Sequence, residues 1–413
     1  DFSTEWEIRD QARLQIYRTV SEAFVAKPML GRITDTSVVV NLMNLLQIDV
    51  YAEYGTQSGS YELSTAPLLN QPPASPIELT ISGLAANTRY YYRIRYRRSG
   101  SETYLSGPEG DFHTYRPRGN SFVFVVEADV HPELVSTGGS GSIDPSRDWQ
   151  LYEVTLQNMA NDDPDFIIDL GDFADIQCEG YSRSILSAEE AIQRYLDGRA
   201  YLDRITHSIP FYLVIGNHEG EQGWRVANPD DSIEVWGCSA RNALIPNPDP
   251  NGFYTGDNDT TTCCGIRRTY YAWEWGDALF VVLDPFWNTQ RAPHWYSEYP
   301  RQGDGWEWTI GSEQYRWLYE TLHNSTAQWK FVFSHHETGG VLTGRSYYGR
   351  GGIESAKYFV DHRPSFEWGG EDSSGNYIFA SMRPGWDHGP IHDMMVQEGV
   401  TIFFHGHDHV YVT

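Results

Sequence analysis

The chain has 413 residues, which is long enough for two or three domains and a large core. Its 30 Lys and Arg stand against 56 Asp and Glu, and the formal net charge is -26. That charge argues against a nucleic acid as a constitutive partner, because it repels a phosphate backbone. The sequence has no run of about 18 apolar residues, so we expect no membrane-spanning helix.

Residues 1–28 are predicted to form a helix that leads into the first domain. Thr4 and Glu7 have the spacing of a capping box, in which each side chain bonds a free backbone N–H. Apolar residues then recur at helical spacing: Leu14, Tyr17, Val20 and Phe24. Pro28 ends this pattern, because proline has no N–H to donate within a helix.

The helical period is lost between residues 31 and 114. Three stretches, 36–41, 49–54 and 88–96, are rich in β-branched and aromatic residues and are separated by turn residues. We therefore expect short strands and an all-β sandwich domain over 31–114. Residues 115–120 contain a proline and a glycine, and they are predicted to link this domain to the next.

From residue 120 to residue 413, strands and helices are expected to alternate, as in an α/β domain whose sheets are flanked by helices. Helical patterning occupies four stretches: 146–159, 188–205, 312–322 and 391–397. Two long stretches, 219–268 and 337–390, do not fit the alternation. Long irregular segments in a compact domain are usually functional, so we expect loops or lids there.

Each of five apolar runs in this domain ends in residues that can bind metals. The runs and their residues are 121–126 with Asp129 and His131, 166–170 with Asp172, 211–215 with Asn217, 331–334 with His335, and 400–403 with His407 and His409. In an open α/β sheet, ligands bind beyond the carboxyl ends of the strands, so the repetition predicts a shared site. Mixed imidazole and carboxylate ligands suit Zn, Fe or Mn.

Any one of these clusters alone is more typical of a turn or a helix cap than of a metal site. As an ordered set, D-x-H, G-D, G-N-H, H and G-H-x-H, they resemble the calcineurin-like metallophosphoesterases over residues 120–411. That superfamily includes purple acid phosphatases and many phosphodiesterases. The resemblance implies a metallophosphoesterase-like fold for 120–413 and two divalent or trivalent transition-metal ions, Zn, Fe or Mn.

The resemblance also implies a role for each motif residue. One ion would take four ligands: Asp129, His131, Asp172 and His409. The other would take Asp172, Asn217, His335 and His407, so that the Asp172 carboxylate bridges the two ions. His218 matches the family's catalytic histidine. The implied reaction is hydrolysis of a small-molecule phosphate ester by a hydroxide that bridges the two ions.

Three residues beside these motifs have other expected roles. The family's V-x-x-H pattern favours His335 over His336 as a ligand. His336 is then expected to contact a ligand residue from outside the metal's coordination shell, or to face the substrate. His405 precedes the glycine turn and is expected to be a buried donor to a ligand. Asp175 stands where purple acid phosphatases have the tyrosine that gives their colour, so we expect no tyrosinate-to-iron absorption.

Three features favour a secreted or periplasmic protein. The chain starts at Asp1 without Met, as a processed form would, and residues 81–92 are similar to the fibronectin type III signature. Many secreted metallophosphoesterases have such a sandwich before the catalytic domain. Four cysteines without metal-binding spacing favour disulfides. Three pairings are possible, and adjacent Cys263 and Cys264 are expected to bond outward to Cys178 and Cys238, because a ring between neighbours is strained.

The sequence leaves the substrate class open among monoesters, diesters and triesters. Candidate substrate-binding residues are Arg345, Arg350, Arg383 and His388, although these arginines are as well explained by pairing with the chain's own carboxylates. A phosphotriesterase-type hydrolase is one alternative function. A non-catalytic extracellular binding or adhesion protein is another, but such a protein would have lost ligands and every motif position here is filled. A metallo-β-lactamase-like enzyme would need H-x-H-x-D-H, which this sequence lacks.

Overall fold

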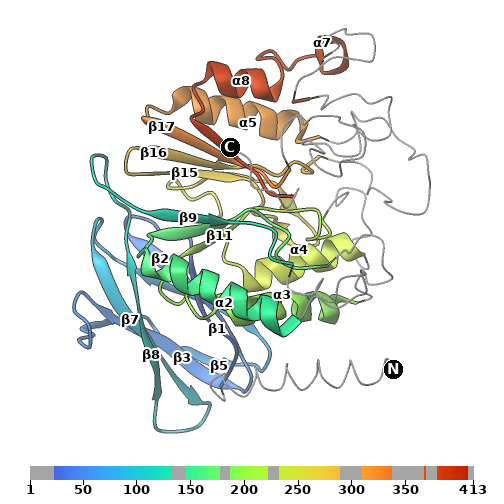
Figure 1. Cartoon of the computed structure of the whole chain (residues 1–413). Coiled ribbons are helices and arrows are strands. Elements are labelled where there is room, and N and C mark those ends of the chain that lie inside the picture. Colours follow the sequence, from blue (N-terminus) through green and yellow to red (C-terminus); the bar gives the residue numbers. More distant parts are fainter. Residues whose placement is uncertain are drawn as a thin grey trace.

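The computed structural model describes residues 23–131, 145–176, 187–221, 232–288, 309–336, 367–368 and 379–407. The first part of the described chain consists of strands, and the second part alternates strands with helices (Figure 1). An all-β region therefore precedes an α/β domain, as the sequence predicts.

The all-β region, residues 24–113, contains two antiparallel sheets. Its strands are β1 (Phe24–Gly31), β2 (Ser37–Asn44), β3 (Ile48–Gly55), β4 (Leu63–Ser64), β5 (Leu68–Gln71), β6 (Pro76–Ser82), β7 (Arg89–Arg98) and β8 (Leu105–His113). One sheet has the order β1-β2-β6 and the other β4-β3-β7-β8, with β5 also paired to β3. Strand β6 shows why a sandwich forms: Ile77, Leu79 and Ile81 are buried and alternate with exposed residues.

Strand β1 corrects the predicted N-terminal helix, because residues 24–28 are part of a strand paired with β2. Phe24 and Ala26 are buried and Val25 between them is half-buried, which is the alternation of a strand. Pro28 lies where the register shifts between Ala26 and Met29, so its missing N–H is not needed there. The rest of the predicted helix, residues 1–22, lies outside the described residues.

The α/β part contains two larger sheets. The first has the order β11-β10-β9 and is parallel: β9 (Phe124–Glu127), β10 (Phe166–Asp169) and β11 (Phe211–Leu213). The second has the order β12-β15-β16-β17-β18: β12 (Thr255–Gly256), β15 (Tyr271–Trp275), β16 (Ala278–Val282), β17 (Trp329–Phe333) and β18 (Ile402–Phe404). Strands β16, β17 and β18 run parallel, whereas β15 is antiparallel to β16.

Aromatic side chains fill the space between these two sheets. The ring of Phe280 lies 5.1 Å from the rings of Phe124 and Phe166, measured between centroids. Phe333 stacks on Phe280 at 6.0 Å. The contacts of Phe280 with Phe124 and Phe166 join β16 of one sheet to β9 and β10 of the other, while the Phe280–Phe333 stack joins β16 to β17 within the second sheet. The five strands that the sequence predicts are therefore divided between two packed sheets.

Helices cover the outer faces of both sheets (Figure 1). Helices α2 (Pro145–Asn161), α3 (Ala188–Leu202) and α4 (Ile233–Leu244) pack with the first sheet. Helices α5 (Gly311–Asn324) and α8 (Ile391–Gln397) pack with the second, and α7 (Phe379–Met382) is one short turn beside them. The four helices predicted from periodicity correspond to α2, α3, α5 and α8.

Helix α4 and two hairpins were not predicted. Helix α4 and the hairpin of β13 (Thr260–Thr261) and β14 (Gly265–Ile266) lie within 219–268, which the sequence presented as irregular. The β15–β16 hairpin was also missed. Its second strand is buried along its whole length, so it has no alternation of polar and apolar residues to reveal it.

The all-β region is joined to the α/β part through a buried arginine. The Arg199 guanidinium of α3 donates to Asn41 Oδ1 on β2 at 2.5 Å and to the Lys27 carbonyl on β1 at 2.5 Å. It also pairs with Asp203 at 3.2 Å. These bonds satisfy a charge that would otherwise be costly to bury, and they fix α3 against β1 and β2.

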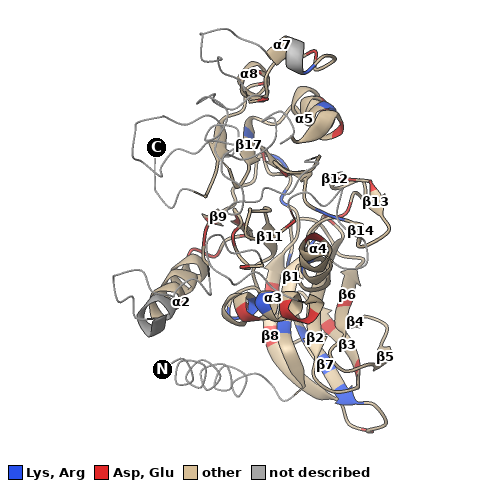
Figure 2. Cartoon of the chain, turned by 90° about the vertical axis from the view of Figure 1, so that its right-hand side faces the viewer, with Lys and Arg blue, Asp and Glu red and all other residues tan. Residues whose placement is uncertain are grey.

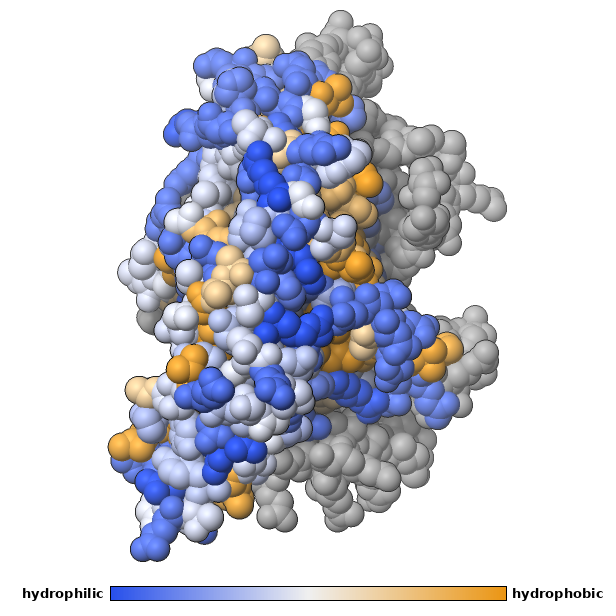
Figure 3. Space-filling model, turned by 90° about the vertical axis from the view of Figure 1, so that its left-hand side faces the viewer, coloured by the Kyte–Doolittle hydropathy of each residue, from blue (hydrophilic) through white to orange (hydrophobic). Residues whose placement is uncertain are grey.

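The exposed face drawn in Figure 3 is largely hydrophilic, with hydrophobic side chains in small groups between hydrophilic ones. Basic and acidic residues are interspersed along α3 and the strands of the all-β region (Figure 2). Within the ranges that the structure describes, no helix has both the length and the apolar character to cross a bilayer.

Candidate metal centre

The turns after β9, β10, β11, β17 and β18 lie together, because parallel strands carry their carboxyl ends to the same edge. They collect the following candidate residues in one place: Asp129, His131, Asp172, Asn217, His218, His335, His336 and His407. Seven of these were named from the sequence as ligands or as the catalytic histidine. The remaining predicted ligand, His409, lies outside the described residues.

Asp172 is the centre of this arrangement. Its Oδ2 atom lies 3.5 Å from His131 Nε2 and 3.9 Å from His218 Nε2 on one side. On the other side the same atom lies 3.1 Å from His335 Nε2, which is itself 3.9 Å from Asp129 Oδ1. The carboxylate therefore belongs to two groups, one with His131 and His218 and one with Asp129 and His335, in each of which all ligand atoms lie within 4.8 Å.

A third group consists of three imidazoles. Ligand atoms of His335, His336 and His407 lie within 4.8 Å of one another, and the rings of His336 and His407 are 4.1 Å apart. Asn217 Oδ1 lies 3.1 Å from His335 Nε2 and 2.9 Å from His407 Nδ1. His336 is thus among the candidate ligands, a position that the sequence pattern gave to His335 alone.

The donor set fits transition-metal ions. Imidazole nitrogens and carboxylate oxygens are the usual ligands of zinc, iron and manganese, and a shared carboxylate is suited to bridge two such ions. Asp172 and His335 are also almost fully buried, at 1% and 0% exposure. Burying this many polar groups at one point is costly unless charges are compensated, and a bound cation would compensate them.

The backbone at the site adopts an uncommon conformation. Asp129, His131, Asp172 and His407 have φ values of 55°, 42°, 56° and 71°, in the left-handed region that residues other than glycine seldom occupy. Bonds between the turns hold them there. The N–H of His407 donates to the Asp129 carboxylate at 2.9 Å, and the N–H of Asp129 donates to the Gly171 carbonyl at 3.0 Å. Strain of this kind is typical of functional sites.

The site residues perturb each other's protonation. Burial alone would raise the pKa of Asp172, but the imidazoles of His335, His218 and His131 hold it well below its usual range. Burial alone would lower the pKa of His335, but the Asp172 and Asp129 carboxylates raise it to about 9. Burial, together with the charges of His407 and His335, lowers the pKa of His336 well below its usual value. His336 is therefore neutral and has a lone pair to offer a metal.

Asp175 lies behind two of the histidines. Its Oδ1 atom is 3.0 Å from His131 Nδ1 and 3.2 Å from His218 Nδ1. Accepting a hydrogen bond from His131 Nδ1 fixes the tautomer of that imidazole and turns its Nε2 toward Asp172, while His218 Nδ1 lies at ion-pair distance from the same oxygen. The Leu170 carbonyl orients His335 in the same way, at 2.8 Å from its Nδ1. This geometry agrees with the predicted role of Asp175 outside the ligand set.

Glu219 is a residue that the sequence reasoning missed. It is fully buried, and its carboxylate accepts backbone N–H bonds from the turns after β10 and β11. Burial and the Asp172 charge raise the pKa of Glu219 to about 7, although these N–H bonds favour its ionised form. The signal in the sequence was its place directly after Asn217-His218.

The described candidate substrate-binding residues, and His405, contact residues outside the ligand set. Arg383 pairs with Glu367 at 3.5 Å, which agrees with the alternative that the arginines pair with the chain's own carboxylates. The backbone N–H of His388 bonds the Tyr315 hydroxyl of α5 at 3.1 Å. The described hydrogen bond of His405 Nδ1 is to the adjacent Gly406 carbonyl, and not to a ligand. Two further candidates lie outside the described residues: Arg345 and Arg350.

The model of the calcineurin-like phosphoesterase family matches residues 122–411, which is more than half of the chain. The search of curated proteins found no match to this chain. The solved structure of PhoD is similar, with a TM-score of 0.55 and 16% identity over 82% of this chain and 68% of the PhoD chain.

The structure of the purple acid phosphatase PPD1 from yellow lupin (Lupinus luteus) seeds aligns with a TM-score of 0.49 and 16% identity. That alignment covers 76% of this chain and 52% of the lupin chain, so this chain spans about half of that protein. The similarity to PhoD, at 16% identity, shows a shared fold and nothing finer. The match to the family model over residues 122–411 is the decisive finding: the chain belongs to the calcineurin-like phosphoesterase family and is a metal-dependent phosphoric ester hydrolase.

Proposed function

We propose that the site binds two transition-metal ions that share Asp172, and that the protein uses them to hydrolyse small-molecule phosphate esters. The observation that carries this proposal is the position of Asp172 Oδ2, which belongs to both carboxylate-containing groups of candidate ligands. Asp129, His131, Asp172 and, from the sequence, His409 would hold one ion. Asp172, Asn217, His335 and His407 would hold the other, and His336 lies close enough to complete or replace a ligand.

When bound, the ions lower the pKa of a coordinated water and neutralise charge on the phosphoryl oxygens. His218 supplies the proton that the leaving oxygen needs, from its Nε2 atom. The support for this role is the position of His218, whose Nδ1 lies 3.2 Å from Asp175 Oδ1 and whose Nε2 lies 3.9 Å from Asp172 Oδ2. The competing role for His218 is that of a ligand, since it forms a group with His131 and Asp172.

Zinc, iron and manganese all suit the ligand set. Because Asp175 and not a tyrosine lies behind His131, an iron-loaded sample is expected to lack a tyrosinate charge-transfer band in the visible spectrum. A visible band that disappears when a tyrosine is replaced would contradict this.

Metal analysis of the purified protein, combined with assays on nitrophenyl mono-, di- and triesters, tests the proposed function. We expect about two ions per chain and loss of turnover after chelation, with recovery when Zn²⁺, Mn²⁺ or Fe²⁺ is returned. Turnover of the triester alone would favour the phosphotriesterase alternative. Full activity after exhaustive chelation would refute the proposal, and metal binding without turnover of any ester would favour a binding or adhesion protein.

We also propose that the protein is secreted or periplasmic and that Cys238 forms a disulfide with Cys264. In the described residues the cysteines are thiols, and Cys238 on α4 is a hydrogen-bond partner of Cys264 in the β13–β14 turn. Asn242 Nδ2 donates to the Cys264 carbonyl at 3.0 Å and so holds that turn against α4. The hydrogen bond to Cys238 lowers the pKa of Cys264 to about 6, which favours the reactive thiolate.

In this pairing an external disulfide oxidant removes two electrons and two protons from Cys238 and Cys264 and is reduced to thiols. Cys263 is then left for Cys178, which lies outside the described residues. We further propose that the all-β region is a fibronectin type III-like sandwich, on the support of its signature at residues 81–92 and its two antiparallel sheets.

A further inference from the structure

The carboxylate of Glu219 connects the two turns that carry the central site residues. Its Oε2 atom accepts N–H bonds from Asp172 at 3.0 Å and Gly216 at 2.6 Å. Its Oε1 atom accepts N–H bonds from Phe173 at 2.8 Å and Ala174 at 3.0 Å. Three of these donors belong to the turn after β10 and the fourth to the turn after β11.

The two turns approach too closely for any side chain at Gly216. A Cβ there would lie 2.8 Å from Glu219 Oε2 and would also overlap Asp172. The Asp172 side chain closes the arrangement from the other direction, because its Oδ1 atom accepts the N–H of His218 at 2.9 Å. The turn after β10 therefore donates three backbone N–H groups to Glu219, and the turn after β11 donates one, that of His218, to Asp172.

Asp172 needs such support. Its φ of 56° is unfavourable for an aspartate, and it persists only where surrounding bonds hold it. An isolated turn would relax to an ordinary conformation, and Asp172 Oδ2 would leave its place between His131 and His335. Four N–H bonds to one buried carboxyl group oppose that relaxation.

We propose that Glu219 is a positioning residue that sets the metal affinity of the site by holding the Asp172 turn in its strained conformation. The inference rests on the proposed function in so far as Asp172 is a metal ligand. Among the described residues, the hydrogen bonds of the Glu219 carboxylate are to backbone N–H groups, and none is to a candidate ligand atom of a histidine.

The test replaces Glu219 with glutamine, which keeps the size of the side chain but turns one oxygen into an NH2 group. Two of the four backbone N–H groups would then face a donor instead of an acceptor. Replacement of groups that orient metal ligands typically reduces metal affinity by about 10- to 100-fold. We expect E219Q to show a loss in that range, measured by Zn²⁺ titration against a chromophoric chelator, while its circular dichroism spectrum remains that of the native protein.

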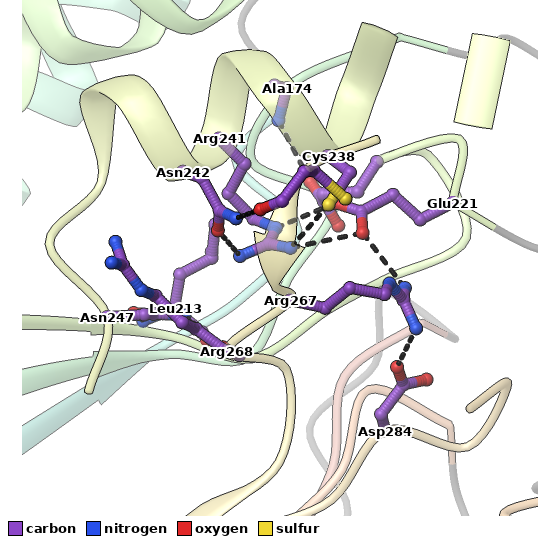
Figure 4. Close-up of polar contacts among 12 residues, drawn as sticks. Ala174, Leu213, Glu221, Cys238, Arg241, Asn242, Asn247, Arg267, Arg268 and Asp284 are labelled. Carbon is purple, nitrogen blue, oxygen red and sulfur yellow. Dashed lines mark hydrogen bonds and ion pairs between the residues drawn. The ribbon is translucent and has the colours of Figure 1, made fainter. Parts of the chain in front are cut away.

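Glu221 provides a matched control two residues away. It is equally buried, and it pairs with Arg241 at 2.6 Å and Arg267 at 2.9 Å, while Arg267 pairs with Asp284 at 3.2 Å (Figure 4). Among the described residues, Glu221 accepts no hydrogen bond from the Asp172 turn. E221Q should therefore lower the melting temperature of the metal-free protein and leave its Zn²⁺ affinity unchanged.

Two results would overturn the inference. One is an unchanged Zn²⁺ affinity in folded E219Q. The other is an equal loss of affinity in E221Q, which would show that any buried carboxylate nearby has the same effect through stability. A loss of affinity in E219Q alone supports the inference even if the native protein hydrolyses no phosphate ester, and that combination would refute only the proposed function.

Discussion

Charged residues are compensated differently in the all-β region and at the candidate metal centre. In the all-β region, Asp49 pairs with Arg97 at 2.9 Å, and Glu53 pairs with Arg93 at 2.8 Å and Arg95 at 3.0 Å. These pairs lie across neighbouring strands, where opposite charges stabilise the sheet modestly. Acidic and basic residues are therefore neighbours in this region (Figure 2).

At the metal centre, the ion-pair partners of Asp172 among the described residues are three histidines, and no lysine or arginine is among them. Histidine compensates a carboxylate only while it is protonated, and a protonated imidazole cannot bind a metal. The two regions thus differ in the partners that compensate their carboxylates. The sheet neutralises its own charges, whereas the site gathers carboxylates and imidazoles that a bound cation would compensate.

The largest effect should follow from removing the shared carboxylate. Asp172→Asn is expected to reduce ester hydrolysis to background and to reduce the metal content below two ions per chain, because both groups of ligands lose their common member. Plasma mass spectrometry and the nitrophenyl assays measure both quantities. Asp163→Asn is the control, since Asp163 is exposed and pairs with Arg89 in the all-β region. An Asp172 variant that retains two ions and full turnover would show that Asp172 is not a shared metal ligand.

His218→Ala should have the next largest effect and should separate chemistry from metal binding. If His218 protonates the leaving oxygen, turnover of esters with poor leaving groups should fall by about 100- to 10,000-fold while both ions remain. Nitrophenyl esters should be affected much less, because their leaving group needs little protonation. His323→Ala on the exposed face of α5 is the control. If the His218 variant loses an ion, His218 is a ligand, as its group with His131 and Asp172 allows.

The proposed disulfide should contribute an intermediate effect on stability. Under non-reducing conditions, Cys264→Ser is expected to lower the free energy of unfolding by about 2–4 kcal/mol. Cys263→Ser should keep the peptides of Cys238 and Cys264 linked in a mass-spectrometric map of the unreduced protein. Linkage of Cys238 to Cys263 would show that the assignment of partners is wrong, and four free thiols would remove the support for an oxidising compartment.

The smallest effect should come from Arg89, a paired and partly exposed charge on the all-β region. Arg89 pairs with Asp111 and Asp163, both at 2.7 Å, with 36% of its side chain exposed. Because solvent screens such pairs, Arg89→Ala should cost no more than about 1 kcal/mol of unfolding free energy and leave turnover unchanged. Denaturant titration measures the first and the ester assays the second. A large loss of activity would show that this region contributes to the site.

Much of the candidate site could be predicted from the sequence. Asp129, Asp172 and His335 each follow an apolar run, and strands that end in polar residues necessarily place them at a sheet edge. Helices such as α5 and α8 were found because a helical period exposes one face and buries the other. These signals are local, so a single sequence contains them in full.

Other features depended on residues far apart in the chain. Glu219 bonds the backbone N–H of Asp172 across 47 positions of the chain, and the fully buried strand β16 has no period that would separate it from a buried helix. His336 joined the candidate ligands only because β17 and β18 are neighbours and bring His407 beside it.

The sequence by itself determined the order of the motifs, the family and the chemical nature of the ligands, because these depend on residue types and their spacing. The tertiary structure decided that two sheets, and not one, form the edge. It also decided that His336 lies among the candidate ligands, and that the Glu219 carboxylate accepts the backbone N–H groups of the Asp172 turn. Those outcomes depend on packing and hydrogen bonds between distant segments, which no local pattern encodes.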